Sequence, residues 1–228
     1  MNARRQIALL LAIVTVGLTL LPASATGDSA VTLLLRVHIV ESSVFDLNAA
    51  AIVKEKHITD RVEHINNMFA PAGIRWKVED IRFDRAANTL PFERAAKGRE
   101  GLAPLPALVR RRDLIGPKGF DLYVIRDLSE LGIGGAYRCG ADPKRSGVAF
   151  IAARTANDNV QRLRKWAHEL GHALALSHAP CEEEWADNLM MSSRCEHAEP
   201  RRIQLIDRQI QRIAEQAPNG PAPCKTGR

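Results

Sequence analysis

The stretch His168-Glu169-Leu170-Gly171-His172-Ala173-Leu174-Ala175-Leu176-Ser177-His178 decides how the rest of this 228-residue chain is interpreted. Two histidines four residues apart lie one turn from each other on the same helix face, so both imidazoles can reach one tetrahedral metal ion. A third histidine, six residues beyond the second, can complete the set only if the helix ends between them. The pattern therefore predicts a Zn²⁺ site, one ion per chain, bound by His168, His172 and His178.

The carboxylate of Glu169 directly follows the first predicted ligand. Three protein ligands leave the fourth position of a tetrahedral zinc site to water, whose pKa the metal lowers toward about 7. A neighbouring carboxylate can then take the proton of that water as a general base. Hydrolysis of an amide bond, with Glu169 as the catalytic base, is the predicted chemistry.

This stretch resembles the long motif of the metzincin clan of zinc metallopeptidases, HExxHxxGxxH. The resemblance implies that His168, His172 and His178 are zinc ligands and that Glu169 is the general base. Ala175 occupies the position of the clan's glycine. Because glycine adopts a left-handed backbone without a Cβ penalty, alanine weakens the prediction of a sharp turn but not of the ligand set.

A second stretch, Asp187-Asn188-Leu189-Met190-Met191, resembles the Met-turn that lies beneath the zinc in this clan. Met190 fits the Met-turn position best, with Met191 as the alternative. Some clan members carry a tyrosine ligand two residues after this methionine, but here the position is Ser192. The resemblance therefore implies a site with three histidines.

Other residues near the motif offer alternative ligands. Asp187 could replace His178 as the third ligand, and this alternative stays open. Cys181 follows His178 closely, so a cysteine ligand or a latency switch is conceivable. The acidic run of residues 182–184 is interpreted as a solvated loop.

The amino terminus predicts export. Residues 1–25 contain Arg4 and Arg5, a mostly apolar run over residues 7–21, and the small-x-small sequence Ala23-Ser24-Ala25. This is the pattern of a cleaved signal peptide, and the apolar run is short for a membrane span. We therefore expect a secreted or periplasmic protein with no stable membrane anchor, whose residues 26–228 form one catalytic domain.

An even number of cysteines in an exported chain favours disulfides over free thiols. Three pairings of the four cysteines are possible. Cys181 and Cys195 bracket the predicted Met-turn, and a bridge across that short loop would stabilise the fold by about 3 kcal/mol. We favour this pair, which leaves Cys139 with Cys224.

Hydrophobic periodicity predicts the order of the elements around the motif. Strands are expected at residues 31–41, 74–83, 120–127 and 147–152, and helices at residues 46–69 and after Pro200, in addition to the zinc helix capped by Asn157 or Asp158. With the resemblance, this order implies an α+β fold with a twisted five-stranded mixed sheet. Residues 84–117 are expected to form a surface excursion.

A glycine-rich extended segment precedes the strand at residues 147–152. In metzincins the corresponding segment is an antiparallel edge strand above the cleft, whose unpaired backbone groups can bind a substrate peptide as an added strand. The residues expected to align the substrate are Gly134, Gly135, Ala136 and Tyr137.

Charge and composition restrict the partners. The net charge of +6 comes from basic residues scattered among acids rather than clustered with aromatics, which argues against nucleic acid. We expect a monomeric zinc endopeptidase acting on protein or peptide substrates. The alternatives are an exported zinc-binding pseudoenzyme and a zinc amidase acting on cell-wall amides.

Overall fold

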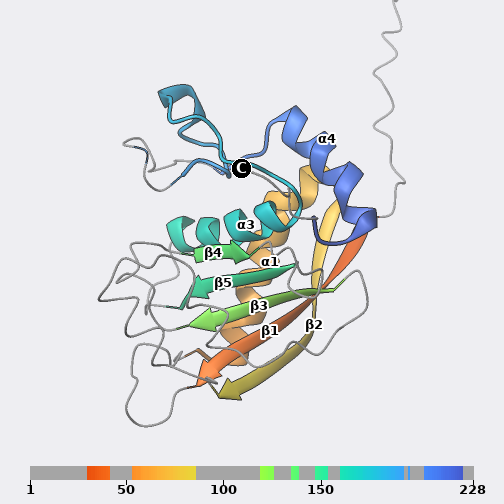
Figure 1. Cartoon of the computed structure of the whole chain (residues 1–228), viewed down its shortest axis with the longest axis vertical. Helices are drawn as coiled ribbons and strands as arrows, with labels where there is room; N and C mark the ends of the chain where they lie inside the picture. Colours follow the sequence, from red (N-terminus) through yellow and green to blue (C-terminus); the bar gives the residue numbers. More distant parts are fainter. Residues whose placement is uncertain are drawn as a thin grey trace, which may run out of the picture.

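The computed structural model describes residues 30–41, 53–85, 119–125, 135–138, 147–153, 160–192, 195 and 203–222. They form a five-stranded sheet with helices packed on one face (Figure 1). In spatial order the strands are β2 (Ile74–Arg85), β1 (Val31–Glu41), β3 (Phe120–Ile125), β5 (Val148–Ala152) and β4 (Gly135–Arg138). The first four run parallel and β4 is antiparallel at the edge. The predicted fold class is confirmed.

The sheet interior follows from the apolar composition of its central strands. In β1 every second side chain from Leu33 to Ile39 is buried against the helices, and all six residues of β3 are buried. Leu35 lies beside Phe120 in the parallel register. Burial on both faces is typical of parallel strands, and it explains why β3 is a continuous apolar run broken only by Asp121.

Helix α1 (Glu55–Phe69) packs on this sheet through apolar side chains at helical spacing. The helix passes into the short 3₁₀ turn η1 (Ala70–Ala72), and Gly73 then adopts a left-handed φ of 64° that leads into β2. The predicted start at Asp46 is wrong, because Lys54 has extended backbone angles (φ −90°, ψ 149°) that interrupt any such helix. Residues 46–52 themselves lie outside the described ranges.

The remaining helices lie after β5. Helix α3 (Val160–Ala173) packs on β4, β5 and α1, whereas α4 (Asp207–Gln216) packs on η1 and η6 (Ala217–Asn219). The C-terminal helix predicted after Pro200 is α4, and it begins only at Asp207. Residues 203–206 are not helical, because the backbone of Gln204 pairs instead with Asp187 and Leu189.

The segment after η6 closes the end of α3. The backbone N–H of Ala222 donates to the carbonyl of Ala173, the last residue of α3, at 2.8 Å. Beside it, a Cβ on Gly147 would lie 2.6 Å from Cγ of Pro221. The turn that starts β5 therefore needs glycine at this position, both for this approach and for its φ of 78°.

A buried ionic network occupies the sheet face turned away from α1 and α3. Arg36 Nε donates to Asp121 Oδ1 at 2.7 Å, and His38 Nε2 lies 3.1 Å from the same oxygen. The other ring nitrogen of His38 pairs with Asp84, and the ring stacks on Tyr123. Arg36, His38 and Asp121 are all buried. The network therefore ties β1, β2 and β3 together through polar side-chain contacts.

Several predicted features lie outside the described residues. They are the signal peptide, residues 86–117 of the predicted excursion, the helix-cap candidates Asn157 and Asp158, and the cysteines Cys139 and Cys224. The excursion begins later than predicted, because Asp84 and Arg85 continue β2. Among the residues that are described, none of the helices is long and apolar enough to cross a bilayer.

Candidate metal centre

Helix α3 separates an apolar stripe from its histidines. Leu163, Ala167, Leu170 and Leu174 are buried in the core, while His168 and His172 are only partly buried. Trp166, on another side of the helix, is also in the core, with the Arg61 guanidinium 5.0 Å from its ring centre. The helix is thus anchored on two sides and presents its histidine pair outward.

The helix ends in a Schellman turn at the position of the clan's glycine. The N–H of Leu176 donates to the carbonyl of Gly171, and the N–H of Ala175 donates to that of His172, both at 3.0 Å. Ala175 has a φ of 66°, which makes it the one described residue other than glycine with positive φ. The sharp turn is therefore kept although alanine costs roughly 1–2 kcal/mol in this conformation.

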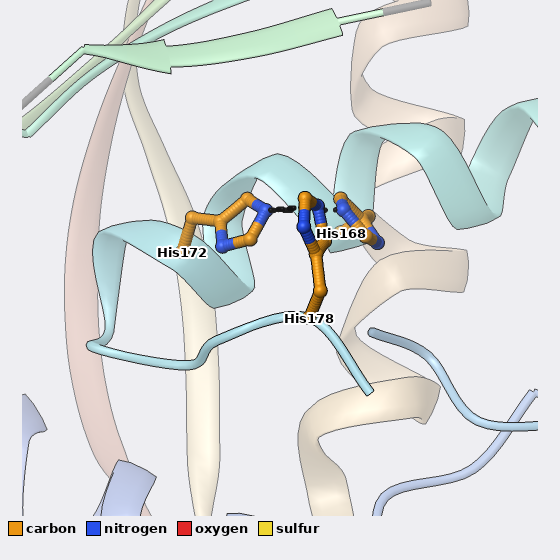
Figure 2. A group of neighbouring side chains, drawn as sticks. All are labelled: His168, His172 and His178. Atoms are coloured by element: carbon orange, nitrogen blue, oxygen red, sulfur yellow. Dashed lines mark hydrogen bonds between the residues drawn. The ribbon is translucent and has the colours of Figure 1, made fainter. Parts of the chain in front are cut away.

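This turn directs the third histidine back toward the first two. Figure 2 shows His168 and His172 from α3 and His178 from the segment below, with their rings pointing toward one another. The Nε2 atom of His172 lies 3.1 Å from that of His168 and 3.2 Å from that of His178. All three ligand nitrogens lie within 4.8 Å of one another.

Backbone carbonyls orient the two rings that belong to the helix. Nδ1 of His168 donates to the carbonyl of Leu189 at 2.9 Å, and Nδ1 of His172 donates to that of Leu176 at 2.8 Å. With the proton on Nδ1, each neutral ring carries its lone pair on Nε2. The lone pairs of both rings therefore face the centre of the cluster.

Burial keeps these rings neutral. Loss of hydration, together with the neighbouring His172 and His178, lowers the pKa of His168 to about 3, although the hydrogen bond to the Leu189 carbonyl acts in the opposite direction. The pKa of His172 is lowered to about 4, again mainly by burial. At neutral pH both rings are in the form that binds a metal.

A zinc ion fits this arrangement. The Nε2 lone pairs of His168 and His172 cannot hydrogen-bond each other, yet the two atoms lie 3.1 Å apart, and a cation bound between them would stabilise this arrangement. Tetrahedral ligands at about 2.0–2.1 Å from a zinc ion are about 3.3 Å apart, close to the two measured Nε2 separations. Three histidines are also a ligand set that leaves one position open.

The predicted Met-turn supports both of the segments that carry the histidines through its backbone. The carbonyl of Leu189 accepts from His168, and the carbonyl of Met190 accepts from the N–H of Ala179, directly after His178. Met190 is fully buried, with its sulfur against Gly171. A disulfide between Cys181 and Cys195, the pair favoured from the sequence, closes the loop around this turn.

The alternative ligands lie apart from the histidine cluster. Asp187 is not part of it, and its charge acts instead on Arg164. Cys181 is in the disulfide, and the acidic residues 182–184 are exposed as predicted, although Glu183 and Glu184 lie in the short 3₁₀ turn η5 (Glu183–Trp185) rather than in a loop. Glu169, the predicted base, follows His168 in α3 and is 8% exposed.

The predicted substrate strand is present in part. Gly135, Ala136 and Tyr137 belong to β4, which pairs antiparallel with β5 at the edge of the sheet, and α3 packs against this strand. Gly134 lies outside the described residues. The strand is thus placed at the same end of the sheet as the zinc helix.

Two buried polar residues near the centre were missed by the sequence analysis. Arg164, one turn before His168, donates to carbonyls of the Met-turn, and Gln209 of α4 pairs with Asn188 in that turn. An arginine four residues before a ligand on a half-apolar helix was a usable signal. Nothing in the sequence distinguishes Gln209 from the exposed polar residues of α4.

No protein-family model matches the sequence, and no curated protein matches it. Among solved structures, the fold is similar to archaemetzincin from Methanopyrus kandleri, with a TM-score of 0.50 and 16% identity over 82% of this chain and 96% of that chain. Metalloproteinase-II from Bacteroides fragilis has a TM-score of 0.45 and 13% identity, over 83% of this chain and 54% of that chain. At such identities the likeness to archaemetzincin shows a shared fold.

Proposed function

We propose that this protein is a zinc-dependent endopeptidase of metzincin type. The observation that carries the proposal is the convergence of three histidine nitrogens, two of them with their tautomer set by backbone carbonyls. The likeness of the fold to archaemetzincin supports it. His168, His172 and His178 would hold the metal.

The residues around the centre would have separate roles in hydrolysis. A zinc ion held here would act as a Lewis acid toward a peptide carbonyl and would acidify water. Glu169 would take the proton of the attacking water on its carboxylate and pass it to the leaving amine. The β4 edge would align the substrate as an added strand.

Export is part of this proposal. A disulfide such as Cys181–Cys195 persists in oxidising compartments, which agrees with a cleaved signal peptide at residues 1–25 and a catalytic domain over residues 26–228. We therefore infer a secreted or periplasmic enzyme.

The test combines metal content with hydrolysis. The purified protein should contain one zinc ion per chain and cleave casein, and a chelator should abolish the cleavage. Glu169→Gln should keep the zinc but lose about 100-fold or more of the activity, because it removes the base and not a ligand. Glu182→Gln is the matched control on an exposed residue.

The same assay separates the alternatives. Zinc binding without hydrolysis of casein or of cell wall would indicate a pseudoenzyme. Release of cell-wall fragments without cleavage of casein would indicate an amidase. A protein that binds no zinc would contradict the proposal as a whole.

A further inference from the structure

The backbone of the Met-turn, residues 188–191, is held by side chains from two helices. Arg164 of α3 donates from Nη2 to the carbonyls of Asn188 at 3.1 Å and Met191 at 2.8 Å. Arg164 is only 5% exposed. One buried guanidinium thus spans both ends of the turn from the helix that carries His168.

The second side chain comes from α4. Gln209 and Asn188 form a reciprocal amide pair, in which Asn188 Nδ2 donates to Gln209 Oε1 at 2.9 Å and Gln209 Nε2 donates to Asn188 Oδ1 at 3.0 Å. The same Asn188 oxygen accepts the backbone N–H of Met190 at 2.8 Å. Both amides are buried, so the loss of one of these hydrogen bonds would leave a polar group that water cannot reach as a replacement partner.

The turn held in this way carries the acceptor that orients a predicted zinc ligand. The Leu189 carbonyl that receives Nδ1–H of His168 lies between the two residues that Arg164 contacts. A shift of this peptide would remove the hydrogen bond that keeps the His168 proton on Nδ1. Hydrogen bonds to the far nitrogen of a histidine ligand set its tautomer and its basicity.

We propose that Arg164 and Gln209 are positioning residues, which form a two-sided clamp on the Met-turn and thereby fix the ring of His168 for metal binding. This inference rests on the proposed function of the centre. Arg164 holds the turn from α3 and Gln209 holds it from α4, so the loss of either side chain would let the Leu189 carbonyl move.

The experiment uses the full chain with Arg164→Met and Gln209→Leu. Lys165→Met is the matched control for the first variant, because it removes an exposed positive charge from the adjacent position of α3. Gln211→Leu is the control for the second, because Gln211 is exposed on the same helix. Arg164→Lys and Gln209→Glu are milder variants that keep part of the bonding, and they replace the first two if those do not fold.

Two quantities are measured at a temperature where unfolding curves show every variant folded. The first is the zinc dissociation constant, from competition with a chromophoric chelator. We expect it to rise about 10- to 100-fold in both clamp variants, less in the milder ones, and to stay within about twofold in the controls. The second is the imidazole ¹⁵N NMR spectrum of the metal-free protein at pH 8, in which His168 should hold its proton on Nδ1 in the wild type and show mixed tautomers in the variants.

The two readouts separate positioning from stability. Folded clamp variants with unchanged zinc affinity and an unchanged His168 tautomer would overturn the proposal, even if their melting temperatures fall. A wild-type protein without zinc affinity would instead contradict the proposed function. The tautomer measurement needs no metal and would still decide whether the clamp orients His168.

Discussion

A β-carbon added to Gly171 would lie 2.6 Å from the sulfur of Met190, so α3 and the predicted Met-turn are in contact at a position where any side chain would force Met190 to shift. Met190 is fully buried and has little room to move away. We predict that Gly171→Ala lowers the free energy of unfolding by about 1–3 kcal/mol, as overpacking does, although alanine is the better helix former. Urea denaturation measures this change.

A double-mutant cycle tests the cause. In a Met190→Ala background the sulfur is gone, and Gly171→Ala should become neutral or stabilising by up to about 1 kcal/mol. An equal loss in both backgrounds would show that the contact with Met190 is not responsible.

Ala175 holds a left-handed backbone that glycine adopts without strain. We predict that Ala175→Gly raises the free energy of unfolding by up to about 1 kcal/mol, since the relief of strain exceeds the extra entropy of glycine in the unfolded chain. Ala173→Gly is the control, because Ala173 is the last residue of α3. Glycine there should lower the free energy of unfolding by about 1 kcal/mol. If both glycine variants lose stability alike, the strain at Ala175 is absent.

Removal of the metal should make stability depend on pH in a defined window. The pKa values of His168 and His172 are about 3 and about 4 in the folded chain, below the ordinary value of 6.5. Below pH 6.5 the unfolded chain therefore binds protons that the folded chain does not, and the free energy of unfolding falls as the pH drops toward 4. These two rings cause no such loss above about pH 7.5.

Urea unfolding of the chelated protein from pH 4 to 8 measures this dependence. His172→Gln removes one of the two rings, so its stability should fall less steeply between pH 6.5 and 4 than that of the wild type. Identical slopes would mean that burial does not hold the ring of His172 in its neutral form.

Removing one partner of the ionic network behind the sheet should lower the stability of the fold strongly. Asp121 is completely buried and contacts both Arg36 and His38. We predict that Asp121→Asn costs about 3–5 kcal/mol, because it leaves the buried guanidinium of Arg36 without its counter-charge. Asp60→Asn, at an exposed pair with Lys56, should cost less than about 1 kcal/mol.

A second comparison shows whether charge is the reason. The double variant Arg36→Met with Asp121→Leu removes both charges and should be more stable than Asp121→Asn alone. A double variant that is less stable than Asp121→Asn would mean that the shape of the side chains, rather than the balance of charge, determines the loss of stability.

The helix that carries His168 and His172 and the order of the strands along the chain could be predicted because they depend on local patterns. The stripe from Leu163 to Leu174 and the alternation in β1 are set by periodicity, which a sequence displays directly. The start of α4 was misplaced because Ile203 and Leu205 continue a helical pattern. The pairing of Gln204 with the Met-turn, which keeps this segment out of the helix, is a contact between distant parts of the chain.

Polar groups that act through tertiary contacts could not be predicted from the sequence for the same reason. His38 alone in a strand has no signature, and its partners Asp84 and Asp121 come from two other strands. The shape of the turn at Ala175 could not be predicted either, because the residue type argues against the left-handed backbone that the surrounding hydrogen bonds impose.

The bond from Ala222 to Ala173 has a consequence for the order in which the molecule is made. A ribosome delivers His168 and His172 well before it reaches residues 217–222, which close the last turn of their helix and pack on the turn that starts β5. While those later residues are still in the exit tunnel, the helix end lacks the partner that completes it. The end of the helix that carries both histidines is therefore completed only once residues 217–222 have left the tunnel.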